Sequence, residues 1–123
     1  MSVNINLSGG LDIWEYHVPS STGKETAKTV EDNQTILGGW LLANNTAGTV
    51  TFVLSYNDGV TDVDFYVKQV AAHDTVIESG FNMRLVKNGV ISCTSSASSG
   101  VSFGMQTVIA VADTPYASNI SNR

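Results

Sequence analysis

Three aspartates around one predicted hairpin are the clearest candidates for metal chemistry in this sequence. Asp58, Asp62 and Asp64 lie close together, and carboxylate oxygens are the ligands that a hard cation such as Ca²⁺ prefers. Their spacing is not that of an EF-hand loop, and Asp62 and Asp64 fall on the outward face of a predicted strand, where they would not converge. We therefore interpret them as a solvated acidic face and expect no metal and no other cofactor.

Histidine and serine side chains supply the candidates for catalysis. In His73-Asp74 the carboxylate could orient the imidazole, but adjacent residues of an extended chain point to opposite sides, so a turn is the better interpretation. The serine-rich residues 94–99 (TSSASS) match neither a nucleophile elbow nor a Ser-x-x-Lys motif. Cys93 shares a strand face with Ile91, which predicts a small buried side chain rather than a reactive thiol. We expect no enzymatic activity.

Aromatic side chains near the N-terminus are the candidates for binding. Residues 11–18 (LDIWEYHV) alternate, with Trp14 and Tyr16 on the clearly apolar face. Such rings could anchor a partner subunit or stack on sugars, because buried aromatic residues dominate interface energies. Packing at the edge of the core is an equally good explanation. We take Ile13, Trp14 and Tyr16 as the candidate interface residues.

The elements that would position these side chains are β-strands. Residues 35–70 hold three strand-like runs separated by two short Asn/Gly turns, and the Gly38-Gly39 pair indicates a bulge or a close backbone approach. In residues 62–70 the alternation predicts Val63, Phe65 and Val67 facing inward.

The second half of the chain repeats this pattern. Strands are predicted over residues 75–78, 83–86, 90–95 and 101–111. About eight short strands and no amphipathic helix predict an all-β fold, a single antiparallel β-sandwich. The pattern leaves jelly-roll and immunoglobulin-like strand orders unresolved.

The apolar pattern also suggests how the chain is divided. We expect residues 1–34 to form an extended N-terminal arm and loop, with residues 19–32 exposed and at most one helical turn around residues 25–30. Residues 35–112 then form the sandwich core, and residues 113–123 form a C-terminal tail.

Charge and hydropathy narrow the classes of partner. The 123-residue chain carries a net charge of −5 and no cluster of basic residues, so the charge pattern of a nucleic-acid binder is missing. Its hydrophobic runs are far shorter than a membrane span, and its first residues lack the pattern of a secretory signal. We expect no nucleic-acid or membrane partner and synthesis in a cytoplasm.

Three segments carry a family resemblance. They are "ILGGWLLANNTAGTVTFVLSY", "DFYVKQVAAHDTVIESG" and "MRLVKNGVISCTSSASSGVSF". Together they resemble small virion structural proteins of tailed bacteriophages, over about two-thirds of the chain. Many such proteins carry Gly-Asp in the last hairpin, whereas this chain has Lys87-Asn88-Gly89, which also forms turns. The resemblance implies a β-sandwich repeated around a capsid or tail axis, and it identifies no site residue.

The resemblance implies a structural function in the virion. We expect a capsid cement or decoration protein, made in the host bacterial cytoplasm, whose partners are other virion proteins and copies of itself. Unprotected strand edges and an arm reaching a neighbour would supply the contacts, so deleting residues 1–32 should leave the sandwich folded but abolish assembly. A neck or tail accessory protein and a carbohydrate- or ligand-binding sandwich module are the alternatives.

Overall fold

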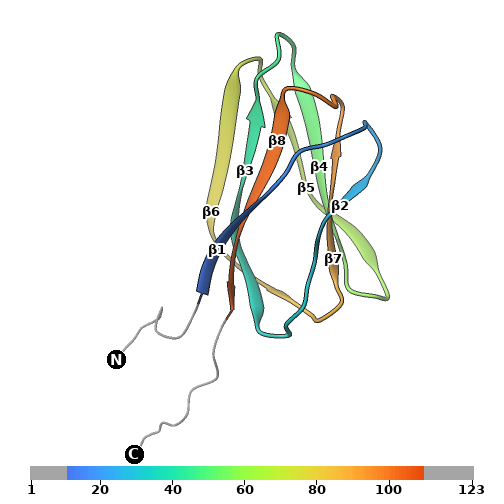
Figure 1. The fold of residues 1–123 in the computed structure, drawn as a ribbon, viewed down its shortest axis with the longest axis vertical. Helices are drawn as coiled ribbons and strands as arrows, with labels where there is room; N and C mark the ends of the chain where they lie inside the picture. The colour runs from blue at the N-terminus through green and yellow to red at the C-terminus, as the bar shows by residue number, and fades with distance from the viewer. Residues whose placement is uncertain (1–10, 110–123) are drawn as a thin grey trace, which may run out of the picture.

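The computed structural model describes residues 11–109, with side chains from Trp14 onward. The described chain consists of strands joined by turns and loops (Figure 1). The strands are β1 (Leu11–His17), β2 (Glu25–Thr29), β3 (Thr35–Asn44), β4 (Val50–Asn57), β5 (Asp62–Val70), β6 (Asp74–Leu85), β7 (Val90–Ser95) and β8 (Val101–Ile109).

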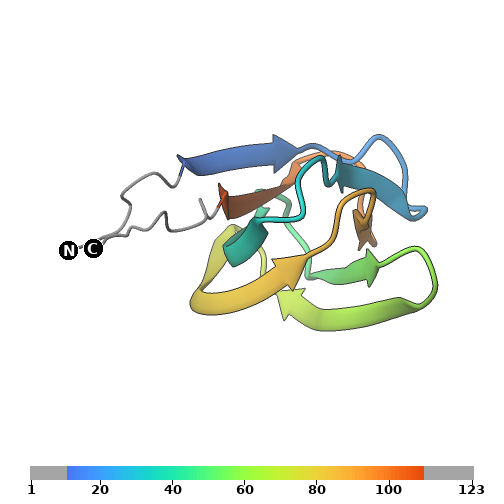
Figure 2. The ribbon, with the colours of Figure 1, turned by 90° about the horizontal axis from the view of Figure 1, so that it is seen from below.

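These strands form two four-stranded sheets that pack face to face (Figure 2). The order is β1-β8-β3-β6 in the first sheet and β2-β7-β4-β5 in the second, and every pairing is antiparallel. The predicted antiparallel β-sandwich is therefore confirmed. Successive strands alternate between the sheets except for the β4–β5 hairpin, and this strand order is that of a jelly roll.

The hydrophobic core lies between the two sheets. Phe52 and Leu54 of the second sheet and Leu42 and Phe103 of the first are fully buried. Burial of apolar surface stabilises by roughly 25 cal/mol per Å², so these side chains account for much of the stability. Cys93 is also buried, at 2% exposure, as the sequence predicted.

Gly38 and Gly39 form the predicted irregularity in β3. The register with both neighbouring strands shifts between Leu37 and Gly39. A Cβ atom on Gly39 would stand 2.5 Å from the carbonyl oxygen of Glu78. The backbones of β3 and β6 therefore approach so closely that only glycine fits at position 39.

The predicted arm over residues 1–34 is corrected by the positions of β1 and β2. Leu11 pairs with Ile109 in the first sheet, and Glu25 pairs with Cys93 in the second, so the sandwich begins before residue 35. The helical turn expected around residues 25–30 is a strand. The apolar pattern missed it because ETAKT does not alternate. Residues 1–10 and the predicted tail at 113–123 lie outside the described residues.

The predicted facing of β5 is right for Phe65 and wrong for Val67. Phe65 packs against the hydrophobic core, whereas Val63 and Val67 are 51% and 61% exposed and Val70 is buried. Tyr66 pairs with the buried Leu54, and the register shifts beyond this pair, so that Phe65 is an extra residue. This β-bulge exchanges the two faces of the strand, which an alternation pattern cannot reveal.

Strand β6 joins two segments that were predicted as separate strands. Residues 75–78 and 83–86 are linked through Gly80, whose φ of 83° is accessible to glycine. Ser79 pairs with Gly39 and Met83 pairs with Leu37, on the two sides of the β3 bulge. Three β6 residues lie between Ser79 and Met83. Eight strands were predicted and eight are described, because this fusion offsets the unexpected β2.

Asn44 organises the loops at one end of the sandwich. Its buried side chain donates hydrogen bonds to the carbonyls of Gly48, Val70 and Ala71, at 2.8 to 3.1 Å. Its Oδ1 accepts hydrogen bonds from the backbone N–H and the hydroxyl of Thr46.

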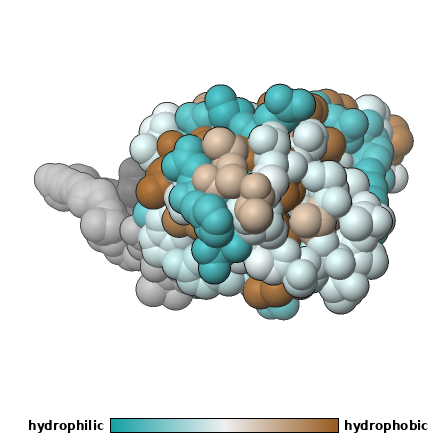
Figure 3. Space-filling view, turned by 90° about the horizontal axis from the view of Figure 1, so that it is seen from above, coloured by the Kyte–Doolittle hydropathy of each residue, from teal (hydrophilic) through white to brown (hydrophobic). Residues whose placement is uncertain are grey.

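Seen end-on from above, the molecule is largely hydrophilic or weakly polar, with hydrophobic patches toward its margins (Figure 3).

Candidate functional site

The outward surface of the first sheet is apolar and partly aromatic. Strand register places Tyr16, Gly104, Leu41 and Ile77 in one row across all four strands. We call this surface the aromatic face. Its large apolar side chains are Trp14, Tyr16, Ile36, Leu41, Ile77 and Val108.

Trp14 and Tyr16 are the most prominent members of the aromatic face. They are 43% and 65% exposed, and their rings stack with centroids 6.3 Å apart and planes 17° apart. The Tyr16 ring lies against Gly104 of β8, where an added Cβ would stand 2.8 Å from the ring. Both predicted aromatic residues therefore project from the core. Ile13 pairs with Thr107 in the backbone, but its side chain lies outside the described residues.

The outward surface of the second sheet has a different character. Its strands present mainly hydroxyl side chains, and Ser55 donates a 2.7 Å hydrogen bond to Asp64. We call this surface the hydroxyl face. Its residues include Thr26, Thr51, Val53, Ser55, Asp64, Val67, Ser92 and Thr94. The two faces of the sandwich therefore differ strongly in polarity.

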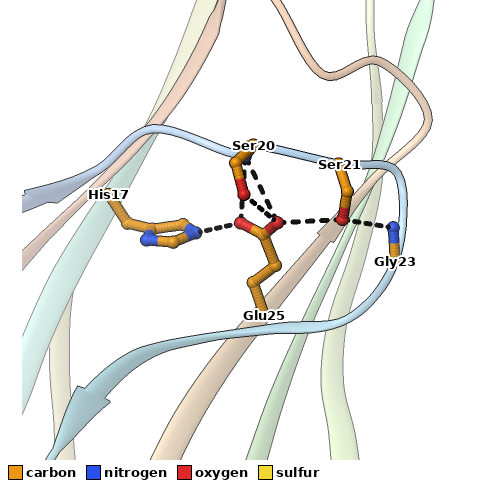
Figure 4. A network of polar contacts seen from close by, with 5 residues as sticks. All are labelled: His17, Ser20, Ser21, Gly23 and Glu25. Atoms are coloured by element: carbon orange, nitrogen blue, oxygen red, sulfur yellow. Dashed lines mark hydrogen bonds and ion pairs between the residues drawn. The ribbon is translucent and has the colours of Figure 1, made fainter.

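A hydrogen-bond network around Glu25 holds the connection between β1 and β2 (Figure 4). His17 Nε2 lies 2.9 Å from Glu25 Oε1, and the hydroxyls of Ser20 and Ser21 donate to Oε2 at 2.7 and 2.9 Å. The Ser20 backbone N–H also donates to this carboxylate. The hydrogen bonds from Ser20, then Ser21, lower the pKa of Glu25 to about 2.

The Glu25 network combines serine, histidine and a carboxylate but is not arranged for nucleophilic catalysis. A triad requires the serine hydroxyl to donate to the imidazole, which would take its proton. Here both hydroxyls donate to the carboxylate instead. The network therefore fastens a loop, and the His17 side chain is 19% exposed at this junction.

A second ion pair crosses between the same two strands. Lys28 Nζ lies 2.7 Å from Glu15 Oε2, and both side chains are largely shielded from solvent. Beside the pair is a cavity of about 300 Å³, also lined by Glu31, Asp32 and Thr107. The edges of β1 and β2 are thus connected by ion pairs rather than by backbone hydrogen bonds.

The predicted acidic cluster does not converge. Asp58 accepts hydrogen bonds from the backbone N–H groups of Val60 and Thr61, and the Thr61 bond is the main cause of its lowered pKa. Asp62 forms an ion pair with Lys24, and Asp64 is bonded to Ser55. Within residues 11–109, no group of three or more His, Cys, Asp or Glu side chains could hold a metal ion.

The remaining candidates have structural positions. His73 lies in the turn between β5 and β6 with a φ of 56°, as the turn interpretation predicted. Burial raises the pKa of the Cys93 thiol to about 12. Trp40 is the second tryptophan of the chain and is 3% exposed. Its ring packs against Phe65, Tyr66 and Phe81, with centroids 4.5 to 5.3 Å away. It therefore cannot stack on a ligand.

Fold and surface define a jelly-roll β-sandwich with one exposed aromatic face. No protein-family model, no curated protein and no solved structure matches the chain. Among the described residues there is no helix with the length and apolar character needed to cross a membrane.

Proposed function

We propose that this protein is a non-enzymatic structural protein of a tailed-phage virion, acting as a capsid cement or decoration protein. Its partners are copies of itself and other virion proteins, and its aromatic face makes the contacts. It is made in the cytoplasm of the host bacterium and remains in the particle.

The exposed aromatic face is the observation that carries this proposal. The side chains of Trp14, Tyr16 and Ile77 are 43%, 65% and 63% exposed on the same surface of the first sheet. Apolar patches exposed in this way mark interaction surfaces. The jelly roll is used by viral capsid domains but also by lectins, so the fold alone does not select a function. The three resembling segments supply the virion assignment.

The positions of β1 and β2 change the mechanism by which the protein would cement a capsid. Leu11–His17 and Glu25–Thr29 are strands of the two sheets, so they are not available to reach a neighbouring subunit as an arm. We propose that the sandwich docks through its aromatic face instead. Many equivalent contacts of modest strength then reinforce the shell through multivalency.

Electron microscopy of intact particles tests this function. Antibodies raised against the folded chain should label the capsid at regular positions, or the neck or tail if the accessory role applies. Purified virions that contain none of the protein would contradict the proposal.

A carbohydrate-binding module is the second candidate, and the stacked Trp14 and Tyr16 rings favour it. Two nearly parallel exposed rings can support a flat ligand. A glycan array distinguishes the candidates: saturable binding that Tyr16→Ser abolishes supports a carbohydrate module, and the structural function predicts no such binding.

A further inference from the structure

We propose that the occupant of the aromatic face is a second copy of this chain, stacked face to face about a two-fold axis. This inference rests on the proposed structural function and names the partner that its surface takes. A two-fold contact uses the same patch on both copies. The row Tyr16, Gly104, Leu41 and Ile77 would lie at its centre.

The size of the aromatic face suits a dimer contact. Four strands about 4.8 Å apart, each with roughly nine residues rising about 3.3 Å, give a footprint of roughly 19 by 30 Å. A standard interface buries about 800 Å² of accessible surface per partner, which a pleated surface of this footprint approaches. Two such sheets pack about 10 Å apart, as the two sheets within one subunit do.

Charge also favours a second copy on this surface. The chain has a net charge of −5, so two copies repel wherever their acidic surfaces meet. By register, the charged residues at outward positions of the first sheet, within residues 11–109, are Asp12 on β1 and Arg84 on β6, one on each edge strand. The centre of the aromatic face therefore carries no like charges that would repel a second copy.

Two aromatic rings lie side by side where the copies would meet. Gly104 lets the Tyr16 ring lie against β8, and Trp14 stacks nearly parallel to it. Gly39 adds no side chain to the neighbouring row. Rings held against the sheet lose little conformational freedom on binding, which suits them as anchors of an interface.

Matched substitutions test the inference on the full-length chain. Ile77 and Val67 are 63% and 61% exposed on edge strands of opposite faces. In sedimentation velocity, Ile77→Ser and Tyr16→Ser should raise the dissociation constant, with roughly a thirtyfold change for Tyr16→Ser, the size of an aromatic hot spot. Val67→Ser should change it little. Circular dichroism confirms that each variant is folded.

Disulfide cross-linking identifies what lies on the face. In a Cys93→Ser background, Leu41→Cys should form a disulfide-linked dimer on oxidation, because position 41 lies near the proposed axis, whereas Val67→Cys should not. Dissociation by Ile77→Ser without cross-linking at position 41 would show that another segment or protein covers the face, and the second-copy inference would be wrong.

The same experiments separate this inference from the proposed function. If only Val67→Ser disrupts assembly, or if the wild type is monomeric but binds virions, the second-copy inference fails and the structural function stands. If the wild type is monomeric and absent from virions, both fail.

Discussion

The Tyr16 ring lies directly against Gly104, so close that a Cβ atom at position 104 would stand 2.8 Å from Cε1 of the ring. The two residues are partners across β1 and β8. A glycine in the interior of a strand weakens it, because it adds backbone entropy and no packing. Here the glycine provides the space that holds an exposed aromatic ring flat on the sheet.

Gly104→Ala should weaken self-association while leaving the stability of the fold nearly unchanged. The added methyl group pushes the 65% exposed Tyr16 ring outward into solvent rather than into the core, so the free energy of unfolding should change by less than about 1 kcal/mol. The raised ring should prevent close stacking of two aromatic faces and weaken self-association. Urea unfolding and sedimentation velocity measure the two effects, and a variant that associates like the wild type would contradict this account of Tyr16.

Gly39→Ala should destabilise the fold itself. A Cβ there meets the Glu78 backbone at 2.5 Å, and backbone in the middle of a sheet cannot move aside as a side chain can. We expect a loss of about 1–3 kcal/mol, typical of overpacking. Gly48→Ala is the control, because nothing lies within 4 Å of its Cβ position. Equal unfolding midpoints for the two variants would refute the close approach.

Asn44→Ala should loosen the loops at the upper end of the sandwich. Three backbone carbonyls lose their donor, and leaving the buried one, that of Val70, unsatisfied costs about 1–3 kcal/mol. Asn45→Ala, an exposed neighbour, should have little effect on thermal stability. If the two substitutions lower the melting temperature equally, the buried amide is not the organising group.

The Glu25 network should make stability depend on acid. Its folded pKa of about 2 lies below the ordinary 4.5, so the charged carboxylate is favoured by folding. The contribution is complete above about pH 4.5 and is lost as the pH falls toward 2. Glu25→Gln should therefore flatten this part of the stability profile. If the slope is unchanged in Glu25→Gln, the Glu25 network does not cause the loss of stability in acid.

The sequence predicted the strands that alternate or are wholly apolar. Runs such as residues 35–44 and 50–57 are visible because their buried side chains share a face. Strand β2 was missed because ETAKT does not alternate. Its place depends on pairing with β7 and on the contacts of Glu25 and Lys28 with β1. The jelly-roll order was undetermined because it depends on pairings between distant segments.

The candidate surface was only partly predictable for the same reason. Trp14 and Tyr16 were identified from one strand's alternation. Leu41 and Ile77 join them only through the register of β8, β3 and β6, which no local pattern encodes. Bulges at Gly39 and Phe65 further shift side chains between faces, so the facing of Val67 was misassigned.

Light scattering of the purified wild-type chain over a concentration series, at low and high salt, measures whether two copies associate in solution. We expect a mass of at least a dimer that persists at high salt, because an apolar contact is not weakened by charge screening. A monomer at every concentration and salt would show that the aromatic face does not hold a second copy.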